Sequence, residues 1–215
     1  DIGLEIGHSV RTVEACMLEA GQDITVETNL LEARFLWGDR SLYMEFSQRF
    51  RARFDAQHFF NGKLAEQQAR HARFDDSAYK LEPNLKDSPG GLRDLHTIHW
   101  LAQACGITGG WSGIARAGLL TPAEARRIAR EERSLSALRI HLHILARRRE
   151  DRLAFDYQTD LAERLGLAAT AHTRTQGRQS TIEGRVVTPG ERLMRGYYRA
   201  AKLIQRANAT RALDD

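Results

Sequence analysis

The sequence is short of the residues that build covalently cross-linked folds. It has 2 cysteines in 215 residues, Cys16 and Cys105, without CxxC spacing. Both lie in helix-like segments, so we expect free, buried thiols in a reducing compartment. No apolar run approaches the ~20 residues that a membrane-spanning helix needs, and the start lacks a secretory signal pattern. These absences predict a cytoplasmic, globular protein without a membrane partner.

Familiar catalytic motifs are also missing. The chain holds no GxSxG, P-loop or GxGxxG motif, no Asp-x-Asp pair for two-metal phosphoryl transfer, and no His-Asp dipeptide. Among its 8 histidines, His96 and His99 share a helix face, but no acidic or cysteine partner completes a metal site. Structural or surface histidines are therefore favoured. On the residues alone, Asp1 at the head of a strand-like segment is either an ordinary strand-end residue, which is favoured, or a lone third carboxylate of such a metal set.

Lysine is rare, and the net charge of +4 comes almost wholly from arginine. Basic and acidic residues alternate along predicted helices, as in EARRIAREER. A nucleic-acid binder instead gathers its basic residues on a stripe with aromatic residues between them. We therefore interpret these charges as solvated helix faces and expect no nucleic-acid partner.

What the sequence does contain is helical periodicity. Residues 1–11 alternate apolar and polar positions, which predicts a strand, and nearly everything after them predicts helices. Thr121, Pro122 and Glu124 form a capping box that opens a long helix with one apolar stripe: Ile128, Leu135, Leu138, Leu142 and Leu145. Residues 167–190 lose the periodicity and predict a linker or mobile loop. Further helices are predicted over residues 12–21, 23–38, 40–54, 56–74 (interrupted or started near Asn61-Gly62), 157–166 and 191–208.

The segment LEPNLKDSPGGLRDLHTIHW, residues 81–100, predicts a helix with an unusual start. Ser88 is placed as N-cap and Pro89 as the first helical residue. Gly90 and Gly91 then fall in the first turn, where each costs roughly 1 kcal/mol relative to alanine.

Two explanations of this double glycine stay open on the residues alone. Glycines at a helix start let a phosphate reach the exposed amides, and Lys86 and Arg93 would add positive charge there. Glu82, Asp87 and Asp94 would orient these cations. The alternative is close packing of a neighbouring backbone with a salt-bridged rim.

The same segment resembles the signature of the helical domain in bacterial bifunctional PII uridylyltransferase/uridylyl-removing enzymes. Further segments resemble this family in the family's own order: DIGLEIGHSVRTVEAC, DITVETNLLEARFLWGD, LHILARRREDRLAFDYQTDLAERLG and ERLMRGYYRAAK. The resemblance covers nearly the whole chain except about residues 168–190. It implies a mainly α helical bundle with an N-terminal β-strand remnant of an α/β nucleotidyltransferase domain.

The resemblance also implies a function for a longer protein, of which we expect this chain to be a piece. Such enzymes transfer UMP from UTP to a tyrosine of the PII regulatory protein, with Mg²⁺, and hydrolyse it off again. Glutamine is the effector, at domains outside this chain. The implied division is residues 1–35 as the end of the transferase domain, 36–166 as the helical domain, 167–190 as linker and 191–215 as a helix leading towards an HD hydrolase domain.

The resemblance finally implies site residues. The expected nucleotide-binding set faces the transferase cleft and comprises Lys86, Gly90, Gly91, Arg93 and Asp94. Asp1 takes the place of a third Mg²⁺ carboxylate. The set is catalytically incomplete, so we expect the isolated chain to be inactive. Alternatives are the helical domain of glutamine-synthetase adenylyltransferase, or a non-catalytic module that docks PII and neighbouring domains.

Overall fold

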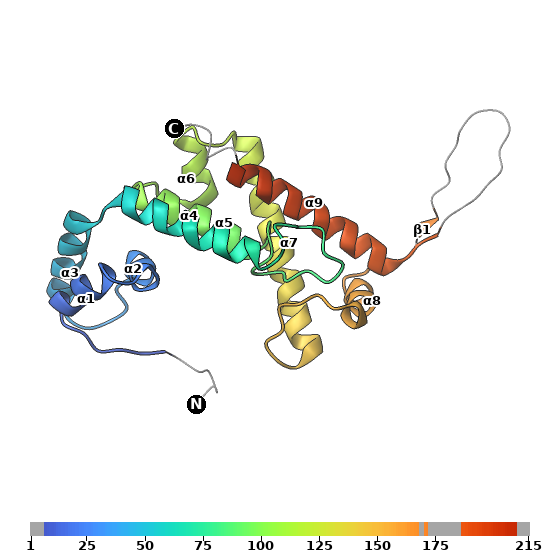
Figure 1. Ribbon diagram of the computed structural model, residues 1–215, viewed down its shortest axis with the longest axis horizontal. Helices are drawn as coiled ribbons and strands as arrows, with labels where there is room; N and C mark the ends of the chain where they lie inside the picture. Colours follow the sequence, from blue (N-terminus) through green and yellow to red (C-terminus); the bar gives the residue numbers. More distant parts are fainter. Residues whose placement is uncertain (1–6, 168–169, 172–185, 210–215) are drawn as a thin grey trace. The chain divides into compact units, whose positions relative to one another are not determined.

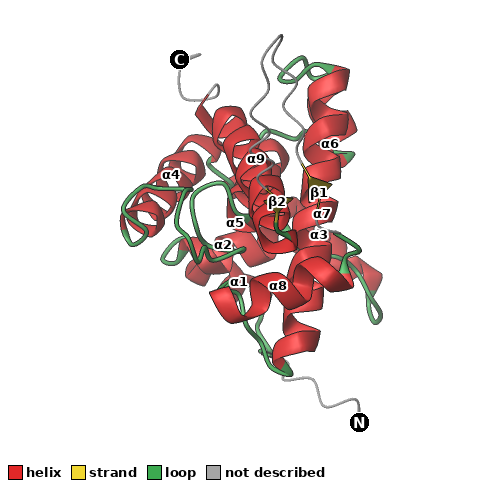
Figure 2. Cartoon of the chain, turned by 90° about the vertical axis from the view of Figure 1, so that its right-hand side faces the viewer, coloured by secondary structure: helices red, strands yellow, loops and turns green. Residues whose placement is uncertain are grey.

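The computed structural model describes residues 7–167, 170–171 and 186–209, and within them the chain is mainly helical (Figure 2). The predicted mainly α fold class is confirmed. The described chain divides into two units, residues 7–65 with 100–106, and residues 66–99 with 107–209. The helices that lie wholly or mostly in the first unit are α1 (Val13–Ala20), α2 (Ile24–Leu31), α3 (Arg40–Arg53) and α4 (Ala56–Ala72).

The first unit is built around α1 and α3, which pack against each other. Val13, Met17 and Ala20 of α1 and Phe50 of α3 are its buried core. Aromatic rings continue this core as a series of neighbours with centroids 5.3–6.1 Å apart: Phe35, Tyr43, Phe46, Phe50, Phe54 and Phe59. Aromatic contacts of this kind add to the stabilisation that burial provides.

Two helix predictions in this unit were wrong in detail. The helix expected to run to Gly38 ends at Leu31, because the chain turns so that the Phe35 ring meets Tyr43 and the Tyr43 hydroxyl donates to the Ala33 carbonyl. The interruption expected at Asn61-Gly62 is absent from α4, which is continuous. Gly62 is there for space, since a Cβ would lie 2.2 Å from Ile24 Cδ1.

The second unit is organised by the long helix α7, which packs against three other helices (Figure 1). The predicted capping box of Thr121 and Glu124 is confirmed, and the buried side of α7 carries four of the five predicted apolar positions. Its helices, besides the last part of α4, are α5 (Leu92–Ala104, which ends in the first unit), α6 (Gly110–Arg116), α7 (Pro122–Ala146), α8 (Phe155–Arg164) and α9 (Pro189–Ala209).

The segment predicted as a linker or loop lies partly outside the described residues. Its described part pairs β1 (Thr170–Ala171) with β2 (Val186–Val187) as a short antiparallel ladder. α9 then begins at Pro189, two residues before its predicted start. Thr188 and Glu191 exchange backbone-to-side-chain hydrogen bonds of 2.9 and 3.2 Å, the same reciprocal pattern that opens α7.

Three remaining expectations concern the first residues, the cysteines and the membrane. Residues 1–6 of the predicted strand lie outside the described residues, and residues 7–12 are irregular. Both thiols are free, but Cys105 is exposed and Cys16 half-buried, so the expectation of two buried thiols was wrong. None of the helices within the described ranges combines the length and apolar character that crossing a membrane requires.

Candidate functional site

The predicted helix start at Ser88 and Pro89 was wrong. The helix begins at Leu92, and the residues between form a turn in which Gly90 has a left-handed φ of +78°. The Ser88 hydroxyl accepts a hydrogen bond from the N–H of Asn84, which lies behind it. An N-cap would accept from an N–H ahead of it, so Ser88 closes a loop instead of opening a helix.

The loop before α5, residues 82–91, is held by backbone and side-chain hydrogen bonds. The Asn84 amide oxygen accepts from the N–H groups of Lys86 (3.0 Å) and Asp87 (2.7 Å), as in an Asx turn. Asn84 also forms an antiparallel bridge with Arg152, in the segment between α7 and α8. Hydrogen bonds within the loop therefore fix its conformation. The bridge to Arg152 also attaches it to a segment almost 70 residues later in the sequence.

The two glycines of this loop lie against other backbone. A Cβ on Gly90 would lie 2.4 Å from the carbonyl oxygen of Ala201 in α9. A Cβ on Gly91 would lie 2.8 Å from the carbonyl oxygens of Lys86 and Ser88. Both glycine amides also donate within the loop region, Gly90 to Asp94 (2.7 Å) and Gly91 to the Ser88 carbonyl (2.8 Å). The structure thus gives both glycines a close-packing role.

The carboxylate of Asp94, in the first turn of α5, collects hydrogen bonds from three directions. It has no exposed surface. Arg70 Nη2 lies 2.6 Å from Oδ1 and His71 Nε2 lies 2.9 Å from the same atom, both from the end of α4. Gln67 Nε2 donates at 3.2 Å, and the Gly90 N–H binds Oδ2. Asp94 therefore ties α4, the loop and α5 together.

The environment of Asp94 keeps it charged. Burial by itself raises the pKa of this carboxyl group, because it disfavours the charged form. The hydrogen bond from His71 and the charge of Arg70 act in the opposite direction and outweigh it, so the pKa of Asp94 lies below its usual value. A carboxylate held charged in this way is a partner for cations and amides, and it is not poised to donate a proton.

A second cluster of the same composition lies at the other attachment of the loop. Asp151 accepts from Arg139 Nε at 2.5 Å and from His143 Nε2 at 3.1 Å. Burial raises the pKa of Asp151, while its hydrogen bonds with Arg139 and His143 lower it to a net value below the usual one. The Asp151 carbonyl accepts from the N–H of Leu85 at 2.8 Å. The loop is therefore fixed between two aspartate–arginine–histidine clusters.

Lys86, in the loop, and Arg93, in the first turn of α5, are cations that reach the surface. Both are half-buried, and the Arg93 N–H donates to the Lys86 carbonyl at 2.8 Å. Burial lowers the pKa of Lys86, and the positive charges of Arg93 and Arg149 lower it further, against the opposing charges of Asp87 and Asp151. Arg93 Nε also lies 3.8 Å from Asp87 Oδ1, so the cations of this surface alternate with carboxylates.

The structure brings Lys86, Gly90, Gly91, Arg93 and Asp94 into one loop and helix start, as predicted, but gives them different parts. The glycines and Asp94 are buried, whereas the two cations reach the surface. Their binding of nucleotide stays a prediction. Asp1 lies outside the described residues, and within those residues no group of three or more histidine, cysteine, aspartate or glutamate side chains is placed to hold a metal ion.

Sequence reasoning missed the partners of Asp94 on α4. Arg70, His71 and Gln67 precede Asp94 by 24, 23 and 27 positions. Their spacing along α4, with positions i, i+3 and i+4, places them on one helix face. That pattern signals a common target for the three side chains, although it does not say which residue the target is.

Comparison with known proteins adds the family. The family model described as GlnD PII-uridylyltransferase matches residues 58–211. The chain belongs to the PII-uridylyltransferase family. It is 74% identical over 208 residues to the bifunctional uridylyltransferase/uridylyl-removing enzyme of Thiobacillus denitrificans. The matched region is 97% of this chain and 23% of that protein.

Other uridylyltransferase relatives match over the same share of the chain. The bifunctional uridylyltransferase/uridylyl-removing enzymes of Bordetella avium and Nitrosospira multiformis are 51% and 50% identical over 97% of this chain, and it covers 23% and 22% of their lengths. The chain thus spans less than a quarter of these relatives. No solved structure matches it.

Asp94 provides the first prediction for this site. Asp94→Asn removes the charge that compensates Arg70 and turns one acceptor into a donor that faces the Gly90 N–H. Losing one partner of a buried pair costs about 3–5 kcal/mol of unfolding free energy. We expect a loss of this size at pH 7 in urea unfolding. Asp75→Asn, at an exposed side chain that pairs with Lys80, is the matched control and should change stability by no more than about 0.5 kcal/mol.

The comparison of wild type with Asp94→Asn also predicts how stability depends on pH. Because the folded pKa of Asp94 is lowered, its contribution to stability is present above the unfolded pKa of about 3.9 and is lost as the pH falls through the folded value. The difference in unfolding free energy between wild type and Asp94→Asn should therefore be constant near neutral pH and shrink below about pH 4. A difference that stays constant down to pH 2 would contradict the charged role of Asp94.

Gly90 provides a second prediction, with an internal control for backbone strain. Gly118 has a nearly identical φ of +79° and nothing within 4 Å of a built Cβ. Gly118→Ala should therefore cost only the left-handed conformation, about 1–2 kcal/mol. Gly90→Ala adds the overlap with the Ala201 backbone and should lose about 1–3 kcal/mol more in urea unfolding. Equal losses in the two variants would show that the close approach of α9 is not required.

Proposed function

We propose that this chain is the helical domain of a longer bifunctional enzyme that transfers UMP from UTP to a tyrosine of a PII regulatory protein and later removes it by hydrolysis. The 74% identity over 97% of the chain to a relative of that name carries the proposal. Chains of this length correspond to one domain or slightly more. Glutamine sensing, Mg²⁺ and a cytoplasmic location belong to the same proposal for the longer protein.

The contribution of this chain is to hold the loop before α5 and its cations in position. Within the described residues no metal-binding cluster exists, so no reaction step is assigned to Mg²⁺ on these residues. The buried carboxylate of Asp94 and the half-buried carboxylate of Asp151 each pair with an arginine and a histidine, which keeps them in the charged state. They serve to fix the loop before α5, and the isolated chain is inactive in both reactions.

Lys86 and Arg93 are the residues of this loop that act on the nucleotide. A backbone hydrogen bond joins Arg93 to Lys86, so both side chains start from adjacent, fixed points of the loop. In the longer protein they face the transferase site and hold the phosphate chain of UTP. Charges that are already in place lower the cost of the negative charge that develops during transfer. Gly90 and Gly91 support this by packing and do not touch the phosphates.

Arg93→Ala in the longer protein tests this role. We expect uridylyl transfer to PII to fall roughly 10–100-fold, as for removal of one charge-stabilising group. Removal of UMP from modified PII should stay within about twofold, because that reaction uses a separate hydrolase site. Both rates are measured with radiolabelled UTP and purified PII. Arg164→Ala, at an exposed arginine of α8, is the control and should leave both rates unchanged.

Two outcomes would contradict the proposal in different ways. If neither transfer nor removal is found in the longer wild-type protein with UTP, Mg²⁺ and PII, the enzymatic function itself is wrong. If Arg93→Ala lowers transfer and removal equally and also lowers the melting temperature, the residue is structural. Binding of PII by the 215-residue chain without any effect of UTP would favour the docking module instead.

A further inference from the structure

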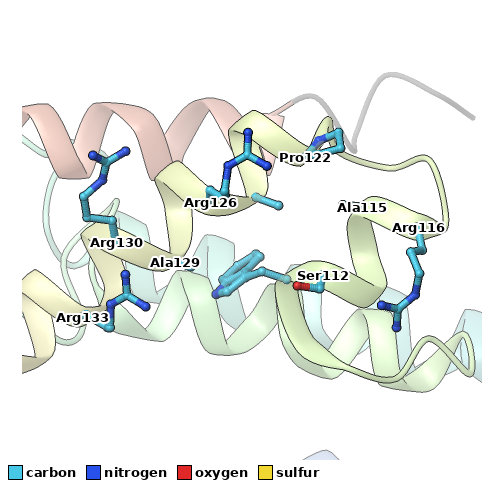
Figure 3. A pocket seen from close by; sticks show the side chains of 10 residues that line it. Ser112, Ala115, Arg116, Pro122, Arg126, Ala129, Arg130 and Arg133 are labelled. Atoms are coloured by element: carbon cyan, nitrogen blue, oxygen red, sulfur yellow. The ribbon is translucent and has the colours of Figure 1, made fainter.

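A groove between α6 and α7 is lined by arginines and small residues. Its volume is about 830 Å³, within the size range of small-molecule sites. Ala115 on α6 and Ala125 and Ala129 on α7 leave the space open, because their side chains end at Cβ. Trp111 lies against the groove and is almost fully buried. Figure 3 shows the arginine side chains that surround this space.

Three of these arginines form a row on α7. Arg126, Arg130 and Arg133 are spaced i, i+4 and i+7, which places them on one face of the helix over about 10 Å of its length. Figure 3 shows the row along α7, while Arg116 lies on the α6 side. All four are exposed. This is an extended array of positive charge and not a single cation.

These four arginines have no carboxylate partner among the described residues. Other arginines of the second unit do, for example Arg70 with Asp94 and Arg139 with Asp151. Two carboxylates of α7 already have other partners. Glu132 accepts from Trp111 Nε1 at 2.6 Å and lies 3.6 Å from His99, and Glu124 is engaged in the capping box of α7.

Glu132 stays charged, and its single negative charge offsets only part of the charge of the four arginines. The neighbouring His99 lowers the pKa of Glu132 below the usual value; burial opposes this, and the hydrogen bond from Trp111 supports it. The result is a hollow with one engaged carboxylate at its buried side and four exposed guanidinium groups around it. Such an arrangement raises the local concentration of anions.

We propose that this groove binds an anion with several linked phosphate groups, held by Arg126, Arg130 and Arg133. Guanidinium groups bind phosphate oxygens in pairs, and every phosphate of a linked chain keeps at least two non-bridging oxygens as acceptors. A chain of phosphates can contact all three arginines of the row, which a single small anion cannot do. The ligand is either a free inorganic oligophosphate or the phosphate chain of a nucleotide. This site is separate from Lys86 and Arg93 and does not depend on the proposed function.

Titration calorimetry of the 215-residue chain with inorganic triphosphate, without divalent cations, tests the proposal. We expect one site per chain, and at least tenfold weaker binding in the double variant Arg126→Ala/Arg130→Ala. The control is Arg127→Ala/Arg164→Ala, which removes the same charge from exposed positions outside the groove and should bind within about twofold of wild type. Circular dichroism checks that both variants keep the wild-type helix content.

Further ligands separate the sources of the phosphate chain. Equal affinity for UTP and inorganic triphosphate assigns the site to the phosphates alone, and tighter binding of UTP assigns it to a nucleotide; both support the proposal. Equal losses in the groove and control variants, absence of triphosphate binding, or equally tight binding of monophosphate or of an oligoglutamate peptide would overturn it.

Discussion

The second unit depends on the buried carboxylate of Asp94. A charge without exposed surface is costly unless its neighbours compensate it, and here Arg70, His71 and the Gly90 amide do so. These partners come from the end of α4 and from the loop before α5, while Asp94 itself is in the first turn of α5. One charge therefore fixes two helices and the turn between them. The same geometry explains why residues after Gly90 can begin a helix without a conventional N-cap.

Much of the fold follows from local sequence, and the exceptions have local causes. TPAE at residues 121–124 predicted the start of α7. The matching TPGE at 188–191 marks the start of α9, two residues before the start that periodicity predicted. DSPGG at 87–91 has serine-proline where those segments have threonine-proline, but no glutamate three residues after Ser88 completes the box. Ser88 instead bonds backwards to Asn84, and the helix start moves to Leu92.

The sequence shows which residues of the candidate site lie together, but not which of them are buried and what they contact. The chain segment itself brings Lys86, Gly90, Gly91, Arg93 and Asp94 together, so any sequence argument finds them side by side. Their division into buried residues and half-buried cations depends on contacts from α4, α9 and the segment before α8, which sequence spacing does not reveal. The arginine row on α7 was read as a solvated face for the same reason, because the hollow beside it is created by α6.

The bridge between Asn84 and Arg152 has a consequence for the order in which the chain folds. Leu85 bonds to Asp151 and Leu153 to Pro83, so the two partners are separated by about 70 residues of sequence. At ribosomal rates of roughly 5–20 residues per second, the second partner emerges roughly 4–14 seconds after the first. The close contact of Gly90 with the Ala201 backbone can form only after Ala201 has been synthesised, which is later still. Within these 215 residues, the loop that carries the cations is therefore among the last parts to take its final form, because its closing contacts are the least local.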